Sequence, residues 1–382
     1  MPTPTLLLIA AVATWSTTSA TFAKPMQEPA PRRIAAATSE LPEPFTAVGA
    51  VAELPDGRVL VSDHKDRSVQ LADFASRAVA TAARTGSGPL EFQLPGGFYP
   101  MRSGEIWMID NPQRRYLRFS PQGKPLGTRP YAEVSGGFSF SSENRDPHVL
   151  DGAGAEYLLD RGGRAAAAAD SAPLVRRTAK GSDTVARVGL PEMTVSTAIG
   201  ARIMSMVTFS PADGFAVARS GAIALVRSRP YRIDWVSPTG TLTRGPEVTF
   251  TPLPVTDADR AKSAESRKNA KMPGGIQIMT SDGKGGQRAM SPADLVPEAK
   301  FAETKPAFDP QQIRMAPDGR VWVRRHTPLG ANELYDVFDP TGKRVDRLEL
   351  PARTRLIGLG MTSMYVVRLD DEDLMYLGRV TY

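Results

Sequence analysis

The chain of 382 residues contains no cysteine. This absence excludes disulfide bonds, zinc bound by cysteine, covalently attached c-type haem and a cysteine nucleophile. It also excludes the acylated cysteine that anchors bacterial lipoproteins. A serine-hydrolase signal is missing too, because no Gly-x-Ser-x-Gly motif gives His148 a nucleophile to activate.

Long apolar runs and dense basic stretches are also absent. Beyond the N-terminal region no apolar run approaches 18 residues, so no transmembrane helix is expected. The chain carries 47 Lys and Arg against 41 Asp and Glu, a formal net charge of +6, but its basic residues are scattered. Without a basic stripe among aromatic residues, this charge indicates a mixed solvated surface, and no nucleic-acid partner is expected.

The N-terminus has the pattern of an export signal. Residues 6–14, "LLLIAAVAT", form an apolar core that is too short to span a bilayer. A stretch of small and polar residues follows, with plausible cleavage after Ala20 or Ala23. The preceding "MPTPT" departs from the pattern because it has no Lys or Arg. We therefore expect residues 1–23 to be a signal peptide and the protein to be secreted or periplasmic.

Glycine and proline are abundant, at 33 each, and predict many short elements joined by turns. Three stretches repeat a short apolar run, a turn with glycine and a second run that ends in polar residues: "AELPDGRVLVSDHKDR", "YPMRSGEIWMIDNPQR" and "RMAPDGRVWVRRHTPL". This pattern predicts two strands joined by a tight hairpin. The stretches "YLRFSPQGKPLG", "RIDWVSPTGTLTR" and "YDVFDPTGKRVDRL" predict two further strands around a Pro-x-Gly turn.

The repeating unit is therefore a four-stranded antiparallel blade, and the fold class is an all-β propeller. The units open at six positions, which are Gly57, Gly104, Gly154, Gly221, Gly319 and, by a weaker match, Thr362. Three residues after five of these openings stands a large side chain that is predicted to pack between blades; these residues are Leu60, Trp107, Tyr157, Trp322 and Tyr365. The sequence thus predicts six blades.

The last unit ends about one strand early, so another segment must close the ring. Residues 31–40, "PRRIAAATSE", can supply that strand and cover an exposed sheet edge. We accordingly expect an N-terminal extension over residues 24–40 and the propeller over residues 41–382. An insertion over residues 252–305 separates the fourth blade from the fifth.

These units resemble the blades of NHL-type and related secreted bacterial six-bladed propellers. Such blades run Gly-x-Ile-Tyr-Val-x-Asp, then a loop with Asn and Arg, then a Val-Phe-Asp strand. "GEIWMIDNPQRRYLRFS" matches best and places Asp110 and Arg115 at the family's Asp and Arg positions. The first unit keeps Asp63 but has Ser68 in place of the Arg. The resemblance implies a fold and a binding habit rather than an activity.

The glycine-rich stretch of residues 84–97, "RTGSGPLEFQLPGG", could suggest a phosphate-binding loop. It lacks the Gly-Lys-Ser/Thr end of such a loop, and Glu91 stands where a dinucleotide fingerprint needs its third glycine. We interpret it as a connector between the first and second blades.

Charged residues recur six positions after the blade openings. The first three blades have Asp63, Asp110 and Asp160 there, and the last three have Arg227, Arg325 and Arg368. If all six face the channel, an acidic arc opposes a basic arc, which suits a charged or zwitterionic ligand. The alternative interpretation is a set of local ion pairs at strand ends.

Seven positions after the openings, five blades have a residue with a polar side chain: His64, Asn111, Arg161, Ser228 and His326. Two imidazoles with Asp63 or Asp110 could bind one divalent metal ion, as in propeller lactonases and lyases. The alternative is that these side chains are polar loop tips that never converge. Both sets lie on the face that carries the inter-blade connections, where function is expected.

The insertion breaks the repeat. Residues 256–271 are predicted to be helical, with Thr256 as the N-cap and Asp259 completing a capping box. A lid over the channel mouth and a disordered arm are both compatible with this segment.

The sequence favours a monomeric binding module for a small charged ligand or a protein, without catalysis and without a cofactor. The alternative is a metal-dependent hydrolase of the lactonase type, or a lyase, with its site in the channel.

Overall fold

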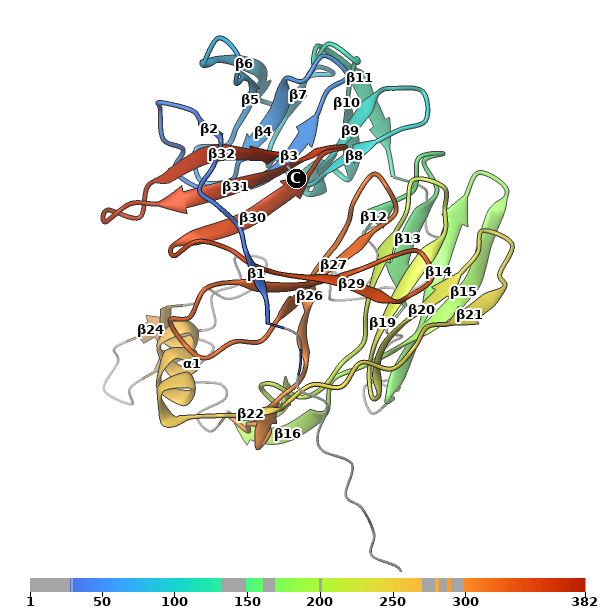
Figure 1. The fold of residues 1–382 in the computed structure, drawn as a ribbon, viewed down its shortest axis with the longest axis vertical. Coiled ribbons are helices and arrows are strands. Elements are labelled where there is room, and N and C mark those ends of the chain that lie inside the picture. Colours follow the sequence, from blue (N-terminus) through green and yellow to red (C-terminus); the bar gives the residue numbers. More distant parts are fainter. Residues whose placement is uncertain are drawn as a thin grey trace, which may run out of the picture.

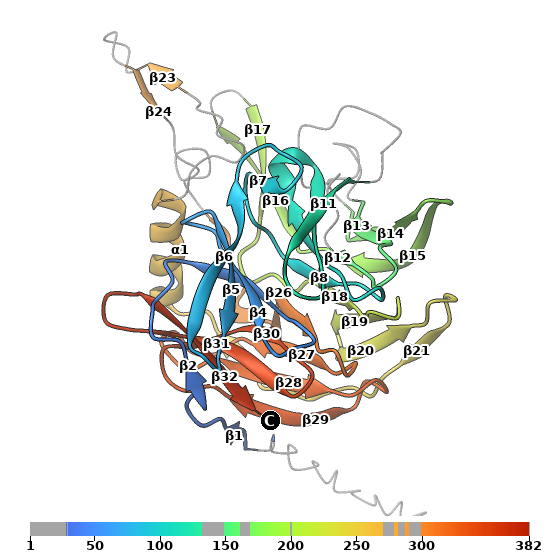
Figure 2. The same ribbon diagram turned by 90° about the horizontal axis from the view of Figure 1, so that it is seen from above.

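A computed structural model describes residues 28, 30–131, 149–160, 169–198, 201–269, 279–281, 287–289 and 299–381. Its strands form a six-bladed β-propeller (Figure 1). The colours follow the sequence around the ring, and the last, red blade lies beside the first, blue one (Figures 1 and 2). The repeat inferred from the sequence is therefore confirmed.

The blades follow the chain order. The first contains β3 (Val48–Glu53), β4 (Val59–Asp63), β5 (Ser68–Asp73) and β6 (Ala78–Thr85). The second contains β8 (Phe98–Pro100), β9 (Ile106–Asp110), β10 (Arg115–Phe119) and β11 (Pro125–Pro130), with a 3-10 turn, η1 (Asn111–Gln113), between β9 and β10. The third contains β12 (Val149–Leu150), β13 (Glu156–Leu159), β14 (Ser171–Thr178) and β15 (Gly181–Gly189).

The fourth blade contains β18 (Gly214–Val217), β19 (Ile223–Ser228), β20 (Tyr231–Val236) and β21 (Leu242–Arg244). The fifth contains β26 (Phe308–Met315), β27 (Val321–Arg325), β28 (Leu334–Phe338) and β29 (Arg344–Glu349). The sixth contains β30 (Thr354–Leu359), β31 (Ser363–Leu369) and β32 (Met375–Thr381), and its outer strand is β2 (Ser39–Glu40). Two short parallel strands extend outer edges, β7 (Glu91–Phe92) on β6 and β1 (Arg32–Arg33) on β29.

The hairpins between first and second strands depend on glycine. At the five predicted glycine openings φ lies between +81° and +92°. An L-residue with a side chain reaches this conformation only at a cost, so these turns explain why the repeat is marked by glycine.

The two ends of the chain close the ring. In the sixth blade β2 pairs antiparallel with β32, with Ser39 opposite Arg379 and Glu40 opposite Gly378. Main-chain N–H groups of Thr38, Leu41 and Phe45 donate to carbonyls of the same strand and extend this pairing. The outer strand thus comes from the segment in which the sequence analysis placed it.

Apolar layers between successive blades form the core. The large side chains three residues after the openings are all buried there: Leu60, Trp107, Tyr157, Trp322 and Tyr365. Each layer combines residues of neighbouring blades; Tyr365 of the sixth, for example, packs with Val59 and Val61 of the first. The predicted packing position is confirmed.

Two further segments stand outside the blades. A hairpin of β16 (Met193–Ala198) and β17 (Ala201–Met206) separates the third blade from the fourth, and the sequence analysis did not predict it. Between β21 and β26 lie α1 (Asp257–Asn269), a second hairpin of β23 (Met279–Ser281) and β24 (Gln287–Ala289), and a stem in which β22 (Leu253–Pro254) pairs with β25 (Thr304–Lys305). In Figure 2, β23 and β24 project beyond the blades.

The N-terminus of α1 has the predicted capping box. The Thr256 hydroxyl accepts a hydrogen bond from the Asp259 N–H at 3.3 Å, and the Asp259 carboxylate accepts one from the Thr256 N–H at 3.0 Å. Within the described ranges, no helix has the length and apolarity needed to cross a membrane.

Removal of the closing strand should destabilise the propeller. A chain that starts after Glu40 loses β1, β2, the buried Ile34 and the ion pair between Glu40 and Arg368. We expect its free energy of unfolding to fall by several kcal/mol, about the value of a few buried apolar side chains. Thermal and urea unfolding measure this, and a chain that starts at Glu28 is the control. Equal melting temperatures for the two chains would contradict the proposed closure.

Candidate functional site

Asp63, the last residue of β4, is 1% exposed and is surrounded by backbone donors. Its carboxylate accepts hydrogen bonds from the N–H groups of Thr46 and Ala47 at 2.8 and 2.9 Å. The N–H groups of Lys65 and Asp66 donate to the other oxygen, at 3.0 Å each. The carboxylate therefore ties the segment before β3 to the loop after β4.

Asp110 has the same position at the end of β9. It is fully buried and accepts the N–H groups of Gln93 and Leu94, both at 3.2 Å. Arg115 lies 3.4 Å from its carboxylate and donates to the main-chain carbonyls of Gly88 and Glu91. The Asp and Arg of the resemblance thus fasten the connector between the first two blades. Asp160 differs, because it lies exposed after β13.

The three predicted arginines form ion pairs within their own blades. Arg227 is 2.9 Å from Asp213 and 3.0 Å from Asp234. Arg325 is 2.9 Å from Asp336, and Arg368 is 2.8 Å from Glu40 on the paired β2. These contacts are those of the alternative interpretation, ion pairs at strand ends. A ligand-binding role for the six charges stays a prediction.

The polar residues one position further on have separate surroundings. His64 is exposed, whereas His326 packs edge-on against Phe209, with ring centroids 5.5 Å apart, and burial lowers its pKa. Asn111 accepts the Tyr131 hydroxyl at 2.7 Å. Ser228 donates its N–H to Asp213, and Arg161 lies outside the described residues. In the part of the chain that the structure describes, no three His, Asp or Glu side chains are grouped closely enough for a metal ion.

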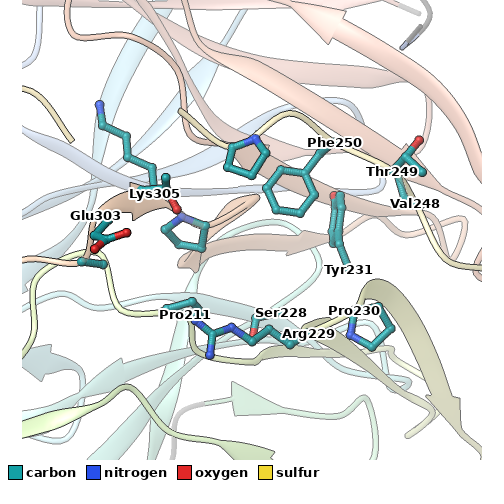
Figure 3. Close-up of a pocket in the computed structure, with 14 residues that line it drawn as sticks. Pro211, Ser228, Arg229, Pro230, Tyr231, Val248, Thr249, Phe250, Glu303 and Lys305 are labelled. Atoms are coloured by element: carbon teal, nitrogen blue, oxygen red, sulfur yellow. The ribbon is translucent and has the colours of Figure 1, made fainter. Parts of the chain in front are cut away.

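The structure instead shows a cavity that the sequence analysis missed. It has a volume of about 700 Å³ and lies on the face of the inter-blade connections (Figure 3). Three segments line it together with Pro211: residues 228–231 between β19 and β20, residues 248–252 after β21, and residues 302–306 before β26. Strand β25 of the insertion stem therefore forms part of one side of the cavity.

Two aromatic residues and four prolines are among the fourteen residues that line the cavity. Tyr231 is 2% exposed and contacts the rings of Phe250, Phe308 and Phe338 at centroid distances of 6.1, 5.4 and 5.8 Å. Figure 3 shows Phe250 and Tyr231 on one side, facing Pro211, Ser228 and Arg229. Four prolines line the cavity, and a proline has no main-chain N–H to donate.

An ionic cluster lies directly behind this wall. Arg325 places its guanidinium 5.5 Å from the ring centroids of both Tyr231 and Phe250. The fully buried Asp336 accepts the Tyr231 hydroxyl at 3.0 Å. Burial, and then the Asp336 carboxylate, raise the pKa of Tyr231 well above its ordinary value, so the phenol stays neutral.

Asp336 is shared by three cations, because Arg344 and Arg347 approach it at 3.5 and 3.3 Å in addition to Arg325. Glu28, from the segment before β1, lies 2.8 Å from Arg347 and 3.6 Å from Arg325. The cluster thus contains three arginines and two carboxylates, and these five side chains sum to one positive charge. Buried charges of this kind depend on one another for compensation.

Lys305 attaches α1 to the stem strand β25 of the insertion. Its ammonium is 2.7 Å from the Asp259 carboxylate and 5.3 Å from the Phe209 ring centroid, and both charged side chains are 5% exposed. In Figure 3 the Lys305 side chain extends away from the other lining residues. Burial by itself would raise the pKa of Asp259, but hydrogen bonds from Lys305 and Thr256 lower it to about 2. The first turn of α1 is therefore held by a buried ion pair.

No protein-family model and no curated protein matches the sequence. Solved structures with a similar fold include a putative exported protein from Bacteroides fragilis, with 13% identity over 89% of this chain and 92% of that chain, and a TM-score of 0.47. A virginiamycin B lyase from Staphylococcus aureus has 11% identity over 90% and 97%, with a TM-score of 0.39. A gluconolactonase from Xanthomonas campestris has 11% identity over 92% and 96%, with a TM-score of 0.40. These proteins are propellers, as this chain is.

The ionic cluster and the surface ion pairs should respond differently to mutation. Asp336→Ala leaves three arginines without their shared partner, so we expect a loss of about 3–5 kcal/mol in the free energy of unfolding. Arg368→Gln breaks an exposed pair and should cost less than about 1 kcal/mol. Urea unfolding measures both values. Similar losses in the two variants would show that burial does not distinguish these pairs.

The ion pair of α1 should make stability depend on pH. In Asp259 the folded-state pKa of about 2 lies below the ordinary value of 3.8, so the stabilisation is complete above about pH 5 and is lost as the pH falls toward 2. The difference in unfolding free energy between wild type and Asp259→Asn should therefore be constant from about pH 7 to 5 and shrink at about pH 4 and 3. Asp257→Asn, at an exposed position of the same helix turn, is the control. A difference that does not change with pH would argue against the buried pair.

Proposed function

We propose that this protein is an exported six-bladed propeller that binds a small organic molecule in the cavity beside its fourth blade, without catalysis. The observation that carries the proposal is the cavity itself. Its volume of about 700 Å³ falls in the range of small-molecule sites, which are concave, mainly apolar and furnished with a few polar groups. The sequence analysis left open whether the binding partner is a small molecule or a protein, and the concave shape of the cavity favours a small molecule.

Two buried ionisable groups beside the cavity, those of Tyr231 and Lys305, support binding rather than catalysis. A general acid or base needs a pKa near the working pH and access to the substrate. The Tyr231 phenol is held neutral and bonded to Asp336, and Lys305 is paired with Asp259. These groups shape the wall and carry no accessible proton for exchange at neutral pH.

Export and a monomeric state belong to the same proposal. The support for export is the pattern of residues 1–23, with its short apolar core followed by small residues. A secreted or periplasmic propeller with a small-molecule cavity fits a role in capturing a compound outside the cytoplasm.

The alternative function is a metal-dependent hydrolase or lyase that uses Asp63, His64 and His326 in the channel. The four N–H groups around Asp63 speak against a free carboxylate ligand there. Elemental analysis of the purified protein separates the two functions. Stoichiometric calcium or zinc, lost together with activity in His64→Ala, would favour the enzyme.

Binding can be tested with the neutral fluorescent probe N-phenyl-1-naphthylamine. We expect saturable binding at one site, and a loss of affinity of about tenfold or more in Phe250→Ala, because that ring supplies apolar contact area. Ala302→Phe, which fills the cavity from the opposite segment, should also block the probe. Leu242→Ala, at an exposed apolar position of β21, is the control. If the probe binds all four proteins alike, the cavity is not the binding site.

A further inference from the structure

We infer that the ligand of this cavity is an organic monoanion with an apolar ring body, and that Arg229 at the rim binds its acidic group. The inference rests on the proposed function and names the chemical class of ligand and the residue that selects it. It follows from four features of the cavity: an arginine without an ion-pair partner, a charge surplus behind the wall, a shortage of main-chain donors and a single rim carboxylate.

Arg229 differs from the other arginines near the cavity. Arg227 and Arg232 both pair with Asp234, and Arg325 pairs with Asp336. Arg229 lines the cavity, is exposed, and makes no ion pair or hydrogen bond with another side chain in the described ranges. A guanidinium offers five N–H donors in a plane that fits a carboxylate, sulfonate or phosphate oxygen pair. Its charge is therefore available to a ligand.

The positive charge of the ionic cluster behind the wall also favours an anionic ligand. The five side chains of the ionic cluster sum to one positive charge, and the Arg325 guanidinium lies against the two rings that form the wall. The charge of Lys305 is offset by Asp259. The surplus is screened less through an apolar wall than it would be in water, so it favours an anion in the cavity over a cation.

The main chain around the cavity provides few donors for an anion. Four lining residues are prolines, which have no N–H. The N–H groups of Ser228, Val248 and Ala302 already donate to other residues of the protein. We therefore expect side chains to supply most of the contacts to the acidic group, and among the described lining residues Arg229 is the cation without an ion-pair partner.

Glu303 limits the charge of the ligand. Among the described residues that line the cavity it is the one acidic side chain, and it is exposed. A second negative charge on the ligand would lie in the same cavity as this carboxylate and would be repelled. The apolar part of the wall accepts the rest of the molecule, and the half-buried ring of Phe250 favours a ring. Together these features define a monoanionic ring compound.

Two probes that differ only in charge can test this. The probe 8-anilinonaphthalene-1-sulfonate is N-phenyl-1-naphthylamine with one added sulfonate. We expect Arg229→Gln to weaken the binding of the anionic probe by about tenfold more than that of the neutral probe, the usual effect of losing a hydrogen bond to a charged group. Arg229→Lys keeps the charge and should retain most of the difference. Arg77→Gln, at an exposed position of the first blade, should change neither affinity.

The outcomes separate the inference from the function on which it rests. Suppose that the neutral probe binds the wild-type protein. The monoanion inference is then wrong, and the binding function stands, if the anionic probe does not bind or if Arg229→Gln weakens the binding of both probes equally. If neither probe binds the wild-type protein, the proposed function itself fails. An increase in salt concentration should weaken the anionic probe in the wild type and have less effect in Arg229→Gln.

Discussion

The pairing of β2 with β32 is the constraint on which the propeller depends. Each blade buries its apolar faces against two neighbouring blades. If the ring were not closed, two blades would each expose an apolar face to solvent, and one of them would also have an unpaired strand edge. The sixth blade has only three strands from its own part of the chain, and Ser39–Glu40 completes it. The same segment then continues into the first blade, where Phe45 and Val48 are buried with Tyr365 and Leu377 of the sixth.

Polar groups are used in two ways on this scaffold. At the strand ends, carboxylates such as those of Asp63 and Asp110 satisfy main-chain N–H groups of the connections between blades. Between the fourth and fifth blades, the Asp336 carboxylate instead accepts a phenol from one blade and guanidinium groups from the other. Because this cluster backs the wall formed by Tyr231 and Phe250, the geometry of the cavity depends on the interface between these two blades.

The sequence predicted much of the fold because the features concerned are local and repeated. Gly57 and Gly104 mark turns that need positive φ, Trp107 and Trp322 mark the layer between blades, and Thr256 with Asp259 marks the start of a helix within four residues. The cavity was not predicted, because its walls come from separate segments between Pro211 and Pro306 that are brought together only by the ring and the insertion stem. The equal offsets of Asp63 and Arg227 were compatible with a charged mouth or with ion pairs at strand ends, and the structure places partners for both residues within their own blades. The signal that could have revealed the ionic cluster is Asp336, a lone charge between Tyr335 and Val337 in an apolar strand.

The position of Glu28 has a consequence for the order in which the protein can be assembled. This residue precedes the first strand, yet it contacts Arg325 and Arg347, which lie in the fifth blade. β1 and β2 likewise pair with strands that follow them by more than 300 residues. A chain that emerges from its N-terminus first must therefore keep this segment unpaired until nearly all of the sequence is present. Closure of the ring is thus a late event, and a chain that stops short of the last blade leaves β2 without its partner strand β32.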